Sequence, residues 1–475
     1  MTELHKIAYC FTLAASCLLL AMLTACTSAV EVPGPISGEP LKHIVFTVRM
    51  PNATPHTYGM SEAAENEIRT IDVLVFRVDE DTQAEYFDYR AKGIPTTITP
   101  PETTPYNEKS FSVVLQKNDT TDCRLVFLAN VEDELETLSP AHGAQKEALL
   151  ARLLSHNLMV WNVTSGSYKP LPMWGQSAGN LRINDSMKEH GLQGITLLRS
   201  VVSIEVYADE PAVIPDFTLT DVYLYNRKVY GRVAPNDLTS GIITDGDGMR
   251  VTSPSIPTEN MLQPLTVWSG QHYAVPPGDH KLLQTIYTYE AAAVDRGDDF
   301  AATCLVVGGT YTPLGVTQYY RLDFEKRNSG GVFEAYRPLL RNHRYKFIIK
   351  NVTGDGHNTA DSAFYSKKGN LGVEILDWNL ADMSNVVVKE MHWLSLNLST
   401  ITTGNAGGTF YVGVETSHPA GWTATTSDGW ITVDDSHDGY MKIIVGPETV
   451  SRTGTISVKA GNMTKNFRVM QNPSS

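Results

Sequence analysis

Apolar and polar residues alternate with a period of two along most of the chain, which is the pattern of half-buried β-strands. The first such segment, HIVFTVRM, places Ile44, Phe46, Val48 and Met50 on one face. Similar segments follow it: RTIDVLVFRVD, FSVVLQ, RLVFLAN, SIEVYAD, LTDVYLYNRKVYG, RYKFIIKNVTG and LGVEILDW. They do not alternate regularly with long helical segments, as the strands of a parallel sheet would. The pattern therefore predicts a mainly β protein with short helices.

A helical pattern is clear in one segment, QKEALLARLLSHNL at residues 145–158. Its leucines recur at helical spacing and form an apolar stripe made of Leu149, Leu150, Leu153 and Leu154. We expect two further short helices, around Met60–Asn66 and Asp295–Cys304.

The first 26 residues differ from the rest of the chain. After Lys6 comes the uncharged run IAYCFTLAASCLLLAMLTAC, which has about the length of a signal-peptide core. The run ends in Leu-Thr-Ala-Cys, the pattern of a bacterial lipobox, so we expect cleavage before Cys26 and lipidation of its thiol. The alternatives are a plain transmembrane helix or a signal peptide cut elsewhere. Residues 26–40 are a polar tether that contains Pro and Gly.

The composition narrows the class of protein. With 42% hydrophobic and 19% charged residues, the chain can form sizeable cores, and its 475 residues allow two to four domains at about 100–200 residues each. The formal net charge is −14 and the sequence has no run of Lys and Arg. A nucleic-acid partner is therefore not expected, since proteins that bind the phosphate backbone carry basic stripes.

Cysteines and acidic residues give no sign of a metal site. Beyond the signal peptide and Cys26, the cysteines are Cys123 and Cys304, and both lie in apolar runs. We favour two buried free thiols over a disulfide or a metal site, although the compartment permits disulfides. The stretch DGDG at Asp245–Gly248 begins like a calcium loop, but Ile256 stands where the loop needs Glu, so we predict a turn. We expect no metal and no cofactor.

The stretch GQSAG at residues 175–179 matches the nucleophile elbow of serine hydrolases. That elbow needs a buried strand directly before the serine and a helix directly after it. Here Pro170 and Pro172 come before it and the alternating polar stretch NLRINDSMK follows it, so neither flank fits. The later histidines stand in no recognisable triad context. We predict that Ser177 is structural, at a turn after Trp174 that leads into a short strand, and that the chain is not an enzyme.

Seven segments, in order, resemble those of the fimbrillin superfamily of Bacteroidetes, the subunits of type V pili. They are the lone strand HIVFTVRM after the lipobox, ENEIRTIDVLVF (Glu65–Phe76), CRLVFLANV, LPMWGQS, ITLLRSVVSIEV with Ser203 where Lys is common, LLRNHRYKFIIKNVTG with its Arg-Asn-His at Arg341, and LGVEILDW with Trp378. The resemblance implies two β-sandwich-like domains of transthyretin-like type, at residues 41–203 and 204–390.

Residues 391–475 resemble a different unit, the BACON module. The matching segments are WLSLNLSTITTGNAGGTFYVGVETS, GWTATTSDGWITV and SRTGTISVKAGNMTKNFRVMQNP. The resemblance implies a small immunoglobulin-like sandwich, and the strand spacing of about 8–12 residues fits that fold. Some such modules are linked with carbohydrate or mucin binding, so Trp422, Trp430 and Tyr440 are candidate ligand-binding residues. We favour a core role for the two tryptophans and expect Tyr440, in the loop DDSHDGY, to be the exposed aromatic.

The resemblance also implies assembly by strand exchange. It implies that a protease cuts after an Arg in the loop that follows the first strand, and that the C-terminal strand of another subunit then fills the groove that the first strand leaves. Such β-augmentation combines backbone hydrogen bonds with alternate side chains that fill pockets. The apolar face of Ile44, Phe46, Val48 and Met50 suits a releasable strand, because burying it is worth about 6–12 kcal/mol before entropy, at about 1.5–3 kcal/mol for each side chain.

The chain departs from this pattern in two places. The loop PNATPHTYGMSEAAENE contains no Arg, and the nearest are Arg49, inside the strand, and Arg69, at the start of the next. In addition, a further module follows the strand that would be donated. A subunit that keeps its first strand stays at the base as an anchor, whereas one that accepts but does not donate ends the fibre. The two departures therefore point to opposite ends of the fibre. We give the extra module more weight than the missing Arg, because a protease of other specificity could still cut the loop.

The sequence therefore predicts a non-enzymatic subunit of a fimbrium at the cell surface, either a tip subunit or an accessory adhesin. Its expected partners are other fimbrial subunits, the outer membrane through the lipid anchor, and glycans as candidate ligands. The alternatives are a stalk subunit, an anchor subunit, and a non-polymerising surface lipoprotein that binds glycan or mucin. That last protein would keep its first strand and present an exposed row of aromatic residues.

Overall fold

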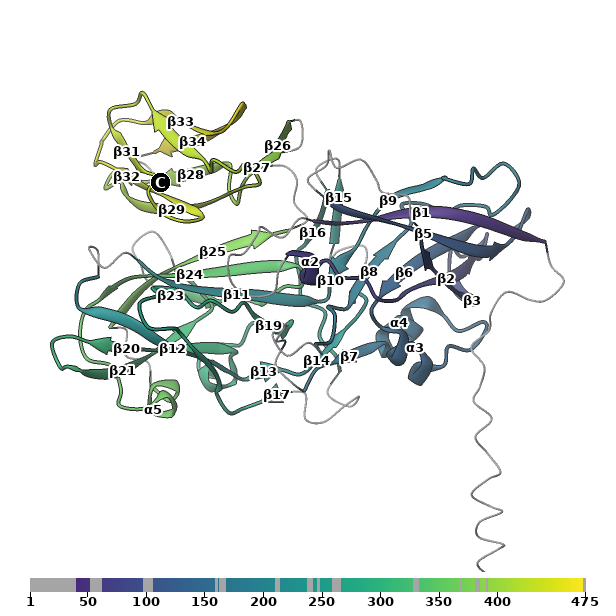
Figure 1. Ribbon diagram of the computed structural model, residues 1–475, viewed down its shortest axis with the longest axis horizontal. Helices are drawn as coiled ribbons and strands as arrows, with labels where there is room; N and C mark the ends of the chain where they lie inside the picture. The colour runs from purple at the N-terminus through teal and green to yellow at the C-terminus, as the bar shows by residue number, and fades with distance from the viewer. Residues whose placement is uncertain are drawn as a thin grey trace, which may run out of the picture.

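The computed structural model describes residues 40–472 except for 52–61, 97–105, 159–160, 162–167, 210–213, 237–241, 246–247, 259–265, 328–332, 367–369, 381–384 and 390–391. Most of the described chain is β-strand, and its larger sheets pair face to face in three successive sandwiches (Figure 1). Each sandwich buries the apolar positions of alternating strands. The prediction of a mainly β chain built from sandwiches is confirmed.

The first sandwich pairs a four-stranded sheet with a five-stranded one. The four-stranded sheet has the order β4 (Ile94–Pro95), β5 (Tyr106–Gln116), β1 (Leu41–Pro51) and β9 (Leu192–Thr196). The five-stranded sheet has the order β10 (Leu198–Arg199), β8 (Met173–Gln176), β6 (Cys123–Ala129), β2 (Ile71–Val78) and β3 (Glu85–Lys92). The core between the sheets contains Phe46, Val73, Phe111, Leu125 and Phe127.

Two short helices belong to a second apolar cluster of this sandwich. Helices α3 (Glu132–Leu138) and α4 (Lys146–Arg152) contribute leucines to a cluster with Leu74 and Phe76 of β2. The helix predicted over residues 145–158 is thus shorter than expected. It ends early because Leu154 already begins β7 (Leu154–His156), which pairs with β14 (Tyr230–Arg232).

The other helical expectations have mixed outcomes. A helix of one turn, α2 (Glu62–Glu65), lies within the first expected segment, and the second holds only the 3-10 turn η2 (Asp299–Ala301). Helices α3 and α5 (Ala360–Phe364) were not predicted. They are too short for an apolar stripe to repeat, which is why the periodicity did not reveal them.

The second sandwich follows directly from the first, because Ser200 separates β10 from β11. One sheet has the order β19 (Ile286–Tyr289), β11 (Val201–Ala208), β24 (His343–Val352) and β25 (Leu371–Asn379). The other has the order β18 (Gln271–Ala274), β12 (Phe217–Tyr225), β20 (Cys304–Tyr311) and β21 (Val316–Asp323). Strands β11 and β24 run parallel and the other neighbouring strands are antiparallel.

Three separate two-stranded ribbons accompany the two sheets of the second sandwich. They are β13 (Arg227–Lys228) with β17 (Thr266–Val267), β15 (Ile242–Asp245) with β16 (Gly248–Val251), and β22 (Glu325–Arg327) with β23 (Phe333–Tyr336). Asp245 and Gly248, at the two ends of the stretch that resembles a calcium loop, pair with each other in the β15–β16 hairpin, and the two residues between them lie outside the described residues, so the turn stays a prediction.

The third sandwich closes the chain. Its five-stranded sheet has the order β26 (Val386–Lys389), β27 (His392–Leu396), β29 (Gly408–Thr416), β32 (Tyr440–Val445) and β31 (Ile431–Asp434). Its four-stranded sheet has the order β28 (Thr400–Thr403), β34 (Met463–Gln471), β33 (Arg452–Ala460) and β30 (Thr423–Thr426). The expected boundary at residues 390–391 falls between β26 and β27, which pair with each other. The unit therefore begins earlier, after β25.

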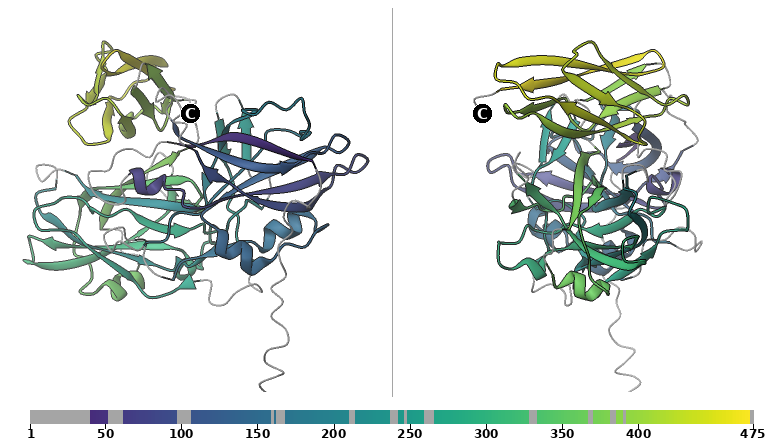
Figure 2. Two further views of the ribbon diagram at one scale, coloured as in Figure 1. Left: turned by 45° about the vertical axis from the view of Figure 1, so that its right-hand side comes forward. Right: turned by 90° about the vertical axis from the view of Figure 1, so that its left-hand side faces the viewer.

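The third sandwich lies over the sheet that contains β24 and β25 (Figures 1 and 2). Ile348 and Leu376 of that sheet form a buried apolar cluster with Tyr411 and Tyr440 of the third sandwich. A side chain at Gly413 would lie 2.6 Å from the Trp378 ring, so glycine lets this strand approach the ring closely. The second and third sandwiches thus share a packed interface.

Candidate functional site

Strand β1 fills an interior position of its sheet. It pairs with β5 in antiparallel register from Leu41 to Pro51, and with β9 in parallel register at Phe46, Val48 and Arg49. Because β1 has a partner on both sides, its removal would leave two unpaired strand edges one strand width apart. This is the geometry of a groove that one extended strand can fill.

The inward face of β1 is completely buried. Ile44, Phe46, Val48 and Met50 each have 0% of their surface exposed, and all four belong to the core of the first sandwich. They are the four residues that the alternating pattern placed on one face. Their burial holds β1 in the sandwich, while whether the strand is released remains a prediction.

The two arginines nearest the loop after β1 are both held by hydrogen bonds. Arg49 Nε donates to Thr196 Oγ1 at 2.9 Å, and the Arg49 carbonyl accepts from the backbone N–H of Leu197. Arg69 pairs with Glu67 at 3.0 Å and donates to the Tyr168 carbonyl. Arg49 lies within β1, and Arg69 lies in the short segment between α2 and β2, where its side chain is held by hydrogen bonds; cleavage after either arginine would have to break these contacts.

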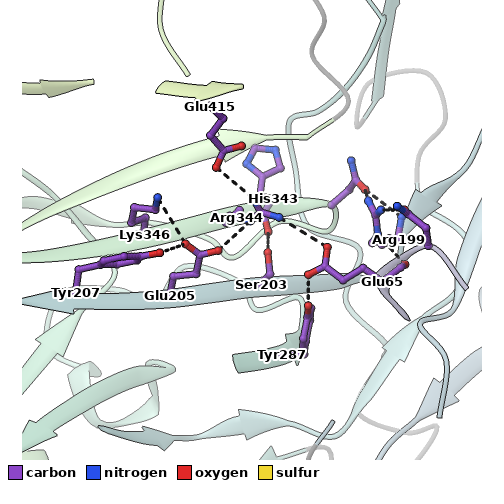
Figure 3. A network of polar contacts seen from close by, with 12 residues as sticks. Glu65, Arg199, Ser203, Glu205, Tyr207, Tyr287, His343, Arg344, Lys346 and Glu415 are labelled. Atoms are coloured by element: carbon purple, nitrogen blue, oxygen red, sulfur yellow. Dashed lines mark hydrogen bonds and ion pairs between the residues drawn. The ribbon is translucent and has the colours of Figure 1, made fainter. Parts of the chain in front are cut away.

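A buried polar network, which we call the junction, lies where the three sandwiches meet (Figure 3). Arg344 on β24 has 1% of its surface exposed and faces three carboxylates. Its guanidinium lies 3.3 Å from Glu205 on β11, 3.3 Å from Glu415 on β29 and 3.7 Å from Glu65 on α2. The arginine therefore links all three sandwiches.

Further contacts fix the carboxylates of the junction. The Tyr287 hydroxyl donates to Glu65, and Lys346 lies 3.7 Å from Glu205. Burial acts to lower the pKa of Arg344, but Glu415, Glu205 and Glu65 together outweigh it and raise the pKa above its usual value. The Arg344 guanidinium therefore stays positively charged and faces one carboxylate from each of α2, β11 and β29.

Helix α2 is anchored by a second arginine beside the junction. Arg199 of β10 donates to the Asn66 side chain and, at 3.3 Å, to the Glu65 carbonyl. Its own N–H donates to the side chain of Asn342, 3.2 Å away. Asn342 has a positive φ of 58° and follows Arg341, which pairs with Glu290 at 2.7 Å and has 0% exposure. The Arg-Asn-His segment is thus structural at these positions.

Sequence reasoning missed the junction. Arg344 and Lys346 alternate with Tyr345 and Phe347 along β24, and that pattern normally indicates a solvated face. Here α2 and the third sandwich cover that face. The signal that could have revealed it is negative charge at Glu205 and Glu415 within otherwise apolar strands.

One of the three candidate aromatic residues of the third sandwich, Tyr440, is buried, and the other two are partly buried. Tyr440 is only 4% exposed, so the expectation of an exposed Tyr440 was wrong. It lies in the interface with the second sandwich, where its hydroxyl donates to Asp209 at 3.1 Å and its ring stacks on His437. Trp422 and Trp430 are partly buried against the core, and Arg452 covers the Trp430 ring at 4.1 Å.

Ser177 is held inside the first sandwich. It has 2% exposure, its Oγ accepts from the Leu125 N–H at 3.2 Å and donates to the Gly179 carbonyl at 3.1 Å. A short strand, β8, does precede it despite Pro172, but β8 is antiparallel to both neighbours, and the described residues 178–199 that follow contain no helix. The expected strand after Gly179 is absent from the described residues, which show only one bridge, between Leu181 and Cys123.

Cys123 and Cys304 are buried free thiols, as predicted. Burial raises the pKa of the Cys123 thiol to about 12 and raises that of Cys304 further.

Within the described part of the chain, no group of three His, Cys, Asp or Glu residues could hold a metal ion. Among the same residues, no helix is long and apolar enough to cross a membrane. Cys26 lies outside the described residues, so its lipidation stays a prediction.

Comparison with known proteins finds no matching protein-family model and no match among curated proteins. Similar solved structures include the tip fimbrial protein Mfa3 from Porphyromonas gingivalis with a C-terminal truncation, at 12% identity and a TM-score of 0.43, covering 72% of this chain and 100% of that one. A putative cell adhesion protein from Parabacteroides distasonis aligns at 17% identity and a TM-score of 0.44, with coverage of 72% and 100%. Scores of this size establish neither a shared family nor a shared function.

Proposed function

We propose that this protein is a cell-surface fimbrial subunit of the tip or accessory type, whose first strand occupies a groove that accepts a strand from another subunit. The observation that carries the proposal is the place of β1. The strand lies at the start of the described chain, fills an interior position between β5 and β9, and buries four apolar side chains completely. An intermolecular strand could replace it without rearranging the rest of the sandwich.

The third sandwich supports a subunit that accepts a strand but does not donate one. Strand β25, the last strand of the second sandwich, pairs with β24 from Leu371 to Asn379. Its Trp378 packs on Gly413 of the third sandwich, and Lys281 pairs with Asp438 across the same interface at 2.9 Å. The end of the second sandwich is thus held in place by a folded unit, which favours a terminal position in a fibre.

The proposal divides the precursor, beyond its signal peptide and tether, into three units, which span residues 41–199, 201–379 and 386–472. It includes a lipidated precursor anchored at Cys26 and partners that are other fimbrial subunits. We retain adhesion as the role of the assembled subunit, without Tyr440 as a ligand-binding residue.

Intact-mass analysis of protein isolated from the cell surface tests this proposal. A mature N-terminus between β1 and α2 is expected in the assembled form, and a lipidated Cys26 in the precursor. Immunogold labelling with antibody against the third sandwich should mark fibre ends at low copy. Regular labelling along the shaft would make the protein a stalk subunit, and an assembled form that keeps β1 would refute strand release.

A further inference from the structure

We propose that the β1 groove selects its strand by two adjacent features: an aromatic ring at the second inward position, and a hydroxyl side chain on the residue that follows it. In the resident strand these are Phe46 and Thr47. The inference rests on the proposed function, because it describes the incoming strand that the same groove would accept. Each feature is recognised by a different part of the groove.

The first feature is recognised by a closed aromatic pocket. The Phe46 ring lies 5.7 Å from the ring of Phe111 on β5 and 5.0 Å from the ring of Phe127 on β6, so both sheets contact it. Gly93 completes the pocket. A Cβ there would lie 2.6 Å from Ile71 Cγ2 and 3.3 Å from Phe46 Cζ. The pocket therefore fits a ring, and a smaller side chain would leave a cavity.

The second feature is recognised by an irregularity in β9. The pairing of β1 with β9 shifts between Phe46 and Val48, and Gly194 lies in this shift with a positive φ of 66°. The Gly194 N–H donates to Thr47 Oγ1 at 2.7 Å, and that hydroxyl donates to Gln193 Oε1 at 3.0 Å. A side chain of β1, and not its backbone, is thus the acceptor for this N–H.

Thr47 is only 8% exposed, so a residue without a hydroxyl would leave the Gly194 N–H poorly satisfied. Sliding the strand by two residues preserves the inward face but moves Phe46 out of its pocket. It also brings Val45 or Arg49 to the position of Thr47. The two features together therefore fix the register of the strand as well as its identity.

A competition experiment on the full chain tests the inference. A site for a specific protease is placed between Pro51 and Glu62, and the purified protein is cut there, so that the β1 segment is held without a covalent link. A fluorescent peptide of residues 41–51 is then added, and unlabelled variants compete for the groove. Uncut protein is the control for binding elsewhere.

We expect the Phe46→Ala peptide to compete about 100-fold less well than the parent peptide, and Thr47→Val about 10-fold less well. Thr47→Ser keeps the hydroxyl and should compete within about threefold of the parent. His43→Ala is the matched control, because the His43 side chain is 56% exposed and its contact with the exposed Glu189, at 3.8 Å, should contribute little. In the protein, Gly93→Ala should weaken binding of the parent peptide by narrowing the ring pocket.

Two negative results have different meanings. If the parent peptide does not enter the cut protein even in large excess, β1 is not exchangeable and the proposed function is wrong. If the parent peptide enters but all variants compete equally, strand exchange stands and the selection by ring and hydroxyl is refuted. Because the peptides carry these substitutions, this readout does not depend on whether Gly93→Ala folds.

Discussion

Replacing Glu415 by Gln tests whether charge at the junction holds the third sandwich on the second. Glu415 is 7% exposed, and its carboxylate lies 3.3 Å from Arg344. The substitution keeps the size of the side chain and an oxygen acceptor but removes the negative charge. Arg344 stays charged, because Glu205 and Glu65 still face it. The change therefore removes an ionic contact that links Arg344 to the third sandwich and keeps the contacts of Arg344 with Glu205 and Glu65.

The expected cost follows from the distance and the burial. Two unit charges 3.3 Å apart attract by about 5 kcal/mol at an effective dielectric constant of about 20. Part of this is offset, because the carboxylate no longer has to be desolvated. We expect the free energy of unfolding to fall by about 2–3 kcal/mol. Glu374→Gln is the matched control, since Glu374 pairs with Lys350 at 3.1 Å but is 37% exposed, and its loss should cost less than about 1 kcal/mol.

The assay combines urea unfolding with hydrogen exchange. A chain of three sandwiches need not unfold in one step, so the third sandwich is followed separately, through the exchange of its backbone amides at increasing urea concentrations. Exchange at the backbone amides of β24 and β29 should become faster in Glu415→Gln, while exchange within the first sandwich should not change. Equal effects of the two substitutions would refute the reasoning, because the buried charge would then matter no more than the exposed one.

Three further predictions concern the first and second sandwiches. Phe46→Asp should lower the stability of the precursor by several kcal/mol, because it buries an unpaired charge, and an unchanged melting temperature would show that β1 is not part of the core. Ser177→Ala should cost about 1–3 kcal/mol by removing the acceptor of the Leu125 N–H, and a fluorophosphonate probe that labels wild type but not this variant would instead show a nucleophile. Because burial raises the pKa of Cys123 to about 12 and also raises that of Cys304, both thiols should stay protonated at pH 8 and resist alkylation until urea unfolds the chain; rapid alkylation of the folded protein would contradict their burial.

The alternation of side chains predicted the strands and the buried face of β1 well, because the period of two depends only on which face meets the core. It failed where two units cover one surface. Arg344 and Lys346 follow the pattern of a solvated face, but α2 and the third sandwich cover that face and both residues are buried. The exposure of Tyr440 was predicted wrongly for the same reason. Tyr440 lies beside an acidic loop and was expected to be exposed, but the second sandwich buries it. Packing between units has no periodic signal in the sequence.

The junction also bears on the proposed strand exchange, because it limits where a released segment could end. Helix α2 is the next described element after β1, and its Glu65 is held by Arg344 and Tyr287 while Asn66 is held by Arg199. A cut between β1 and α2 would free the strand and leave these buried contacts intact. A cut at Arg69 would separate Glu65 from the body of the protein. Arg344, which is only 1% exposed, would then have one carboxylate fewer to balance its buried charge. The polar anchor on α2 therefore favours release of β1 by cleavage before Glu62, whatever the specificity of the protease.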